Sequence, residues 1–163
     1  EYKTELEKRP DAGLLWAMLH DAPKATLGER CIDRKMYDLE GKSYRLSDFR
    51  GKYVLLTFWG RSCSHCIGEI PAMAKFHEQH KDKLVMINLT VDTDEAWRTC
   101  RVNDDITWLN LSDGRSVYGL AKSYELKSLP THVLISPDGK WVNRWGGAPI
   151  FENGELEQFI LSY

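Results

Sequence analysis

An apolar run that ends shortly before a pair of cysteines is the feature that most constrains the fold. The run, Tyr53–Trp59, reads YVLLTFW, which is typical of a strand buried on both faces. Cys63 and Cys66 follow it, and residues 64–80 are expected to form a helix. The chain therefore passes from a central strand into a helix, with two thiols at the junction.

The rest of the chain alternates between expected strands and helices. A second buried strand is expected at residues 84–91, and Thr93 or Asp94 could cap the helix that follows. Strands that alternate with helices and end in an antiparallel hairpin predict an α/β sandwich around a mixed central sheet. The other expected elements are helices at 94–102, 116–124 and 151–162, and β-hairpins at 36–46 and 131–145.

Two parts of unequal size are expected. Residues 1–23 are predicted to be an N-terminal helical appendage, and residues 24–163 a single domain. Residues 12–21 carry an apolar helical stripe, and Pro23 stops the helix. We interpret this segment as a helix packed on the domain, or as the end of a larger N-terminal part.

Charge and hydropathy argue against two classes of function. The formal net charge is −2, which gives no electrostatic case for binding nucleic acid. No apolar run approaches the roughly 20 residues that span a bilayer. Residues 1–7 lack the apolar core of a secretion signal, but for a chain numbered from Glu1 this does not indicate a cytoplasmic location.

Two cysteines separated by two residues allow three interpretations. A zinc site needs four ligands, and the remaining cysteines, Cys31 and Cys100, are isolated in the sequence. A permanent structural disulfide would not require a strand-to-helix junction. At that junction, the helix dipole and free N–H groups stabilise a thiolate on Cys63, which is the reactive form. The placement therefore favours a redox-active pair over a metal site or a permanent structural disulfide.

Two prolines support redox chemistry. Pro71 lies inside the expected helix, five residues after Cys66, where it removes an N–H group and kinks the axis. Pro130 directly precedes an expected buried strand, which suits a cis peptide bond, although a trans proline that starts a strand fits equally well. A cis proline there would hold the backbone against the disulfide and present an edge to an extended substrate.

Taken together, these motifs resemble the thioredoxin superfamily. They are similar in particular to its TlpA/ResA-like branch of extracytoplasmic thiol–disulfide oxidoreductases, which is related to the AhpC/TSA redoxins. The resemblance covers residues 24–163 and implies a thioredoxin-like three-layer sandwich with an N-terminal β-hairpin. The segments that carry it are 59–66, 38–42 with 46–52, 66–71, 129–131 and 137–140.

The resemblance implies a role for each matching residue. Cys63 matches the exposed nucleophile, Cys66 the buried resolving thiol, and Pro130 the cis proline. Glu69 matches a semi-buried carboxylate, and it shares a helix face with Cys66, whose proton it could relay. Thr57 stands where thioredoxin carries a buried aspartate, so Glu69 is the remaining candidate for proton transfer. Substrate contacts are expected from four further residues: Trp59, His65, Leu129 and Thr131.

The resemblance also implies partners and a location. The Cys63–Cys66 disulfide would serve in place of a cofactor. It would exchange with cysteines of extracytoplasmic proteins, including apocytochromes that await haem. A membrane or periplasmic electron donor would complete the cycle. The protein is expected to be a monomer in the bacterial periplasm, or to be anchored in the membrane facing it.

Several cysteine and histidine residues depart from the pattern or remain unassigned. His65 stands where many relatives carry proline, and it could stabilise the Cys63 thiolate, which would make the pair more oxidising than thioredoxin. Cys31 and Cys100 could be two buried thiols or a second disulfide. The other histidines are interpreted as surface or packing residues: His20, His77, His80 and His132.

Two alternative functions remain open. A peroxiredoxin-like thiol peroxidase shares this kind of fold, but its peroxidatic cysteine follows a proline, and here Trp59 stands four residues before Cys63. A non-enzymatic copper-binding module could use Cys63, His65 and Cys66 as ligands. Consumption of peroxide would indicate the first, and binding of Cu(I) without disulfide exchange the second.

Overall fold

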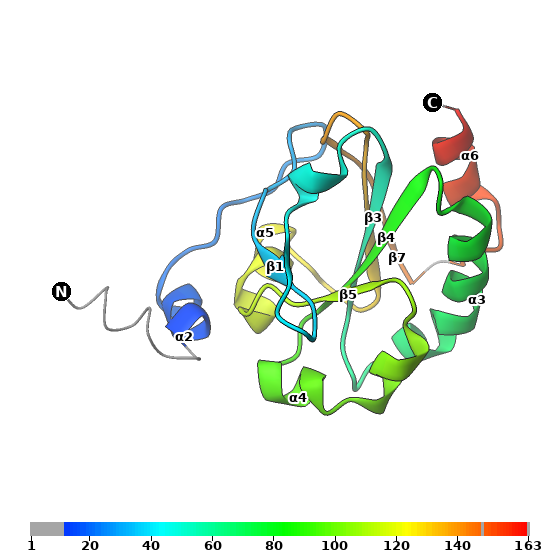
Figure 1. The fold of residues 1–163 in the computed structure, drawn as a ribbon. Helices are drawn as coiled ribbons and strands as arrows, with labels where there is room; N and C mark the ends of the chain where they lie inside the picture. The colour runs from blue at the N-terminus through cyan, green and yellow to red at the C-terminus, as the bar shows by residue number, and fades with distance from the viewer. Residues whose placement is uncertain (1–11, 148, 163) are drawn as a thin grey trace.

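The structure, a computed structural model, describes residues 12–147 and 149–162 (Figure 1). Helices pack on both sides of a central sheet. The helices and 3-10 turns are α2 (Ala12–Leu19), η1 (Leu46–Phe49), α3 (Ser64–His80), α4 (Asp94–Arg98), η2 (Arg101–Asp105), η3 (Ser116–Tyr118), α5 (Leu120–Ser123) and α6 (Glu155–Leu161). The strands are β1 (Met36–Tyr37), β2 (Ser43–Tyr44), β3 (Tyr53–Trp59), β4 (Leu84–Thr90), β5 (Leu109–Leu111), β6 (Thr131–Ile135) and β7 (Trp141–Gly146).

The central sheet has the strand order β5-β4-β3-β6-β7 and is mixed, as predicted. β3 lies in its middle, parallel to β4 and antiparallel to β6. Every residue of β3 is buried, which explains its continuous apolar sequence. β1 and β2 form the predicted short N-terminal hairpin, with Met36 opposite Tyr44. The strand that leads to the cysteines is therefore held by neighbours on both sides.

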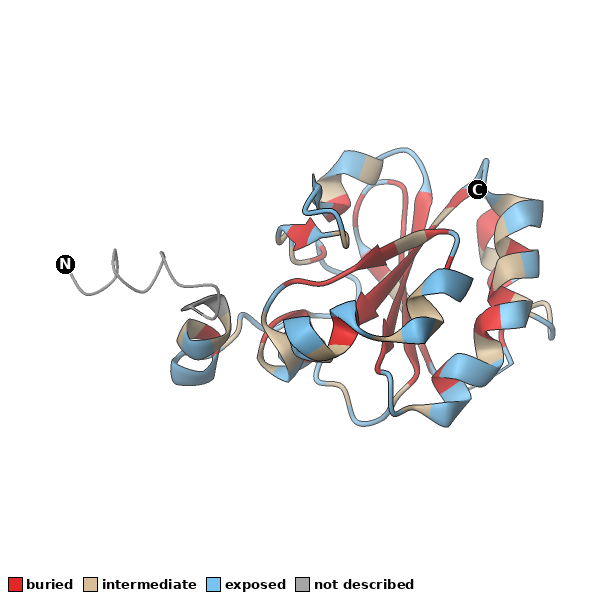
Figure 2. Cartoon of the chain, turned by 60° about the horizontal axis from the view of Figure 1, so that its bottom comes forward, coloured by how far each residue is buried: buried red, intermediate tan, exposed pale blue. Residues whose placement is uncertain are grey.

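Alternating residues of β3 face two separate hydrophobic clusters, one on each side of the sheet. Leu55 and Trp59 belong to the cluster that also contains buried residues of α3, α4 and α6. Leu56 and Phe58 belong to the cluster that contains α5 and residues of the N-terminal hairpin. Figure 2 shows the buried strands between helices whose outer surfaces are exposed. The result is the three-layer α/β sandwich that the sequence predicts.

Three predicted helices are shorter than expected, and α6 begins at Glu155 rather than at residue 151. The helix expected at 94–102 is capped by Thr93, whose Oγ1 accepts from the N–H of Ala96, and α4 ends at Arg98 before the separate turn η2. The helix expected at 116–124 breaks at Gly119 into η3 and α5. A Cβ atom at Gly119 would lie 2.1 Å from Oδ2 of Asp113, so a side chain does not fit there.

The N-terminal helix α2 contacts the domain near η3. The guanidinium of Arg115 lies 5.4 Å from the ring centre of Trp16, and Asp21 forms an ion pair with Lys122 at 3.2 Å. Met18 and Leu19 of the predicted apolar stripe are exposed. Residues 1–11 of the predicted appendage lie outside the described residues, so the division at residue 23 stays a prediction.

Candidate active site

The two cysteines lie where β3 gives way to α3. Cys63 is the N-cap residue of α3, and its N–H donates to the carbonyl of Gly60 at 3.0 Å. Asp92, just after β4, holds the same loop, because its Oδ2 accepts from the N–H of Arg61 at 2.8 Å. Neighbouring strands therefore fix the junction, and the cysteine loop starts from a rigid base.

Cys63 and Cys66 form a disulfide with a Cα–Cα distance of 5.3 Å. Cys63 is half-buried, whereas Cys66 is only 4% exposed. The N–H of Cys66 donates to Sγ of Cys63 at 3.1 Å, in the first turn of α3. In the reduced protein the same donor and the helix dipole would favour a thiolate on Cys63. The more accessible of the two sulfurs thus lies at the N-terminus of α3.

The Leu129–Pro130 peptide bond is cis, which decides between the two isomers that the sequence left open. Pro130 is buried at the start of β6. Leu129 packs against the loop of the cysteines, since a Cβ atom at Gly60 would lie 3.6 Å from its Cδ1. The proline loop and the cysteine loop are therefore neighbours, although about 65 residues separate them in the sequence.

The four residues expected to contact substrate lie in different environments. His65 is exposed and Leu129 half-buried, so both side chains are accessible. Thr131 is 4% exposed, and its Oγ1 donates to the carbonyl of Ser128. Trp59 is 1% exposed and packs in the cluster that contains Cys66. The prediction that Trp59 flanks the exposed sulfur as a docking surface is wrong, because its ring faces the core.

Glu69 contacts His132, a residue for which the sequence indicated no role at the site. The Glu69 side chain is 19% exposed, and its Oε2 lies 3.0 Å from Nε2 of His132. His132 is fully buried on β6, and its Nδ1 lies 2.8 Å from Oγ1 of Thr57. The interpretation of His132 as a surface or packing residue therefore missed its partners. Thr57 and His132 are polar residues within apolar strands, which is the signal that could have drawn attention to them.

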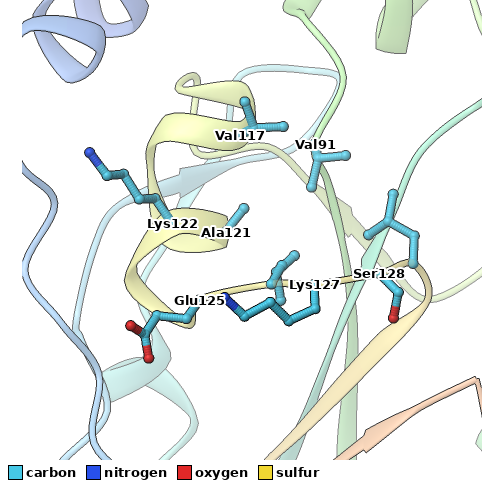
Figure 3. Close-up of a pocket in the computed structure, with 9 residues that line it drawn as sticks. Val91, Val117, Ala121, Lys122, Glu125, Lys127 and Ser128 are labelled. Atoms are coloured by element: carbon cyan, nitrogen blue, oxygen red, sulfur yellow. The ribbon is translucent and has the colours of Figure 1, made fainter.

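Hollows lie beside two segments of the site, the proline loop and α3. One, of about 430 Å³, adjoins the proline loop and is lined by apolar and charged side chains (Figure 3): Val91, Val117, Ala121, Lys122, Glu125, Leu126, Lys127, Ser128 and Leu129. The other, of about 370 Å³, adjoins α3 and includes His65, Glu69 and Glu152. Leu129 connects the first hollow to the cysteine loop, and Glu69 lies in the wall of the second.

The remaining cysteines do not pair. Cys31 is a buried free thiol in the cluster with α5, and Cys100 is a half-buried free thiol packed against the opposite cluster. Because the sheet separates these clusters, the second disulfide considered from the sequence does not form. Burial raises the pKa of Cys31, which keeps it a thiol. Neither cysteine therefore adds to the redox pair.

Two further observations concern metal ligands and membrane-spanning helices. In the part of the chain that it describes, no group of three or more histidine, cysteine, aspartate or glutamate side chains is arranged to hold a metal ion. Within residues 12–147 and 149–162, no helix is both long and apolar enough to cross a bilayer.

Known proteins similar to this chain share its fold and its chemistry. The AhpC/TSA family matches residues 27–143. Thiol-disulfide oxidoreductase ResA of Bacillus thuringiensis subsp. konkukian is 32% identical over 140 residues, which cover 84% of this chain and 78% of the relative. Thioredoxin-like protein YneN of Bacillus subtilis is 32% identical over 116 residues, which cover 69% of this chain and 66% of the relative.

Solved structures with a similar fold include further thiol–disulfide oxidoreductases and thioredoxins. The thioredoxin domain of a thiol-disulfide oxidoreductase from Bacteroides vulgatus aligns with a TM-score of 0.69 at 27% identity, covering 84% of this chain and 99% of that one. The exposed lipoprotein thioredoxin Etrx1 of Streptococcus pneumoniae aligns with a TM-score of 0.64 at 26% identity, covering 81% and 100%.

The fold and the cysteine pair at its strand-to-helix junction thus define a thioredoxin-like redox protein. The chain belongs to the AhpC/TSA family, and within it to the TlpA/ResA-like thiol–disulfide oxidoreductases.

Proposed function

We propose that this oxidoreductase exchanges its Cys63–Cys66 disulfide with cysteines of other proteins outside the cytoplasm. One observation carries the proposal: a half-buried Cys63 caps α3, and a buried Cys66 lies behind it. An accessible thiolate can attack a disulfide on a large partner, while the shielded thiol can react only with its neighbour. This division of roles suits protein substrates.

The first step of the reductive direction uses Cys63. Its thiolate attacks one sulfur of a substrate disulfide, a bond forms between the two sulfurs, and the second substrate cysteine leaves as a thiolate that takes a proton. The N–H of Cys66, which lies 3.1 Å from Sγ of Cys63, would stabilise the attacking charge. The product is a mixed disulfide between the two proteins.

The second step uses Cys66 and Glu69. Cys66 gives its proton to the Glu69 carboxylate, and its sulfur attacks Sγ of Cys63. The Cys63–Cys66 bond forms, the bond to the substrate breaks, and the substrate leaves reduced. Glu69 suits this role because it follows Cys66 by one helical turn and its side chain is partly shielded from water. The two electrons of the new disulfide have passed to the substrate.

The accessible surface around Cys63 would receive the substrate. Leu129 lies next to the cysteine loop and His65 lies between the two cysteines in the sequence, and the backbone around Pro130 and Thr131 would offer an edge to an extended segment. The hollow lined in part by Leu129 would extend this surface. We expect a substrate strand to run along the proline loop, with its cysteine directed at Cys63.

The cellular setting is inferred from relatives. The similar structure from Streptococcus pneumoniae is an exposed lipoprotein, which supports a location outside the cytoplasm for this chain. There the pair would depend on an electron donor in the membrane or periplasm, and apocytochromes that await haem are one class of substrate. His65 is exposed, and its effect on the redox potential stays a prediction.

The substitution Cys66→Ala tests the proposal. The variant should hold substrate proteins as mixed disulfides on Cys63, because the thiol that resolves them is absent. These adducts are measured on non-reducing gels of periplasmic extract and should disappear with reductant. Cys100→Ala is the matched control, since it removes a half-buried free thiol and should trap nothing. Adducts that persist when Cys63 is also replaced would contradict the proposal.

A further inference from the structure

A buried imidazole joins the helix of the cysteines to the sheet beneath it. His132 on β6 and Thr57 on β3 lie directly opposite each other in the antiparallel pair. Nδ1 of His132 is 2.8 Å from the Thr57 hydroxyl, and Nε2 is 3.0 Å from Oε2 of Glu69. Three side chains from three elements therefore form one continuous hydrogen-bonded chain.

The chemistry of the three groups sets the direction of these hydrogen bonds. An ionised carboxylate can only accept, so Nε2 of His132 carries a proton and donates it to Glu69. In the neutral imidazole Nδ1 is then an acceptor, and the hydroxyl of Thr57 donates to it. The hydroxyl of Thr57 thus favours the His132 tautomer in which Nε2 carries the proton and donates it to Glu69.

We propose that His132 is a positioning residue for the exchange reaction, which together with Thr57 keeps the Glu69 carboxylate ionised and oriented to take the proton of Cys66. The inference rests on the proposed function. The proton moves from Cys66 to Glu69, the Cys63–Cys66 bond forms, the bond to the substrate breaks, and the substrate sulfur leaves as a thiolate that takes a proton. His132 keeps its own proton throughout.

The burial of His132 makes its hydrogen bond to Glu69 hard to replace. The ring of His132 is 0% exposed, and the ring of Phe151 packs edge-on against it at 5.2 Å, so water does not replace a lost partner. The other titratable groups that line the hollow at Glu69 are His65 on α3 and Glu152 after β7. Glu152 is exposed, whereas His132 is the buried side chain that faces the Glu69 carboxylate.

Stopped-flow reaction of the reduced protein with dithiobis(nitrobenzoate) separates the two steps. Cys63 releases the first thionitrobenzoate, and the attack of Cys66 on the mixed disulfide releases the second. In His132→Leu we expect the first phase to be unchanged and the second to slow roughly tenfold near pH 6, because a hydrogen bond to a charged group is lost. The acidic limb of its pH profile should move up by about one pH unit.

His132→Gln is the matched variant, because its amide can still donate toward Glu69 but cannot titrate. It should restore most of the second-phase rate and the position of the acidic limb. Thr57→Val keeps the shape of the side chain and removes only the hydroxyl, so it should shift the limb in the same direction as His132→Leu by less. If His132→Leu does not fold, the comparison of these two variants with wild type carries the test.

Three outcomes would overturn the inference. One is a His132→Leu profile that matches wild type, and another is a His132→Gln profile as impaired as that of His132→Leu. If His132→Leu does not fold, the third outcome is a pH profile of Thr57→Val that is identical to that of wild type. A wild-type protein that releases only one thionitrobenzoate would instead refute the proposed function, and the role of His132 with it.

Discussion

Glu69 and Asp113 are both shielded from water, and the two carboxyl groups are held in different ways. Glu69 faces an imidazole, which is itself titratable and linked to a hydroxyl. Asp113, 6% exposed, accepts from two backbone N–H groups, those of Arg115 at 3.0 Å and Leu120 at 2.7 Å. Backbone donors are fixed and carry no exchangeable charge, so they suit a structural role. A side-chain partner can be tuned, which suits proton transfer.

The two carboxyl groups also lie in different regions of the molecule. Glu69 lies one turn after the cysteines, on the sheet face that α3 covers. Asp113 follows β5 and connects to the first residue of α5, which belongs to the other cluster. Burial raises the pKa of Asp113, with its two backbone donors and Arg34 and Arg115 acting in the opposite direction. We expect the first group to govern the reaction and the second to govern stability.

The largest effect is expected from Glu69→Gln. The amide still accepts from Nε2 of His132, so the geometry is kept while the base is lost. The second phase of thionitrobenzoate release should slow about 100-fold, with the free energy of unfolding little changed. Glu78→Gln is the control, because that carboxylate is exposed on the same helix and pairs with Lys81. A rate equal to wild type would remove Glu69 from the mechanism.

Asp113→Ala should show the opposite pattern. One buried and one part-buried N–H group lose their acceptor, which should lower the free energy of unfolding by about 2–4 kcal/mol. Both phases of thionitrobenzoate release should be unchanged in the folded protein. Because the pKa of Asp113 is raised in the folded state, its contribution to stability is greatest below the ordinary aspartate range and falls as pH rises. Urea titrations of wild type and variant at several pH values measure both effects.

His77 is a third shielded titratable group, and of the predicted effects on the protein its effect is the smallest. Nδ1 of His77 is buried and has no hydrogen-bond partner among the described residues, and burial lowers the pKa of the ring. The unfolded chain therefore binds a proton more readily, and stability should fall as pH drops through about 6.5. Solvent screening keeps this small, because the ring is only half-buried.

The substitution His77→Gln should remove this part of the pH dependence. Thermal unfolding at pH 5.5 and 8 measures it, with His65→Gln as the control because that ring is exposed. Curves for His77→Gln that decline with pH as steeply as wild type would assign the acid sensitivity to other groups.

The amino-acid sequence by itself determined the order of the elements and the redox pair. Apolar runs specify buried strands, and Cys63 and Cys66 at a strand-to-helix junction specify thiol chemistry, because both signals are local. Glu69 could be inferred for the same reason, since one helical turn relates it to Cys66. These predictions needed no knowledge of contacts between distant segments.

Only the tertiary structure decided which distant side chains meet. The burial of Trp59 depends on the helices that cover its face of β3, and the meeting of Thr57, His132 and Glu69 depends on strand register and on the placement of α3. A shift of one residue in register would turn His132 to the other face of the sheet. A local pattern contains no information on that choice, so the partner of Glu69 emerges only once the sheet and the helix are assembled.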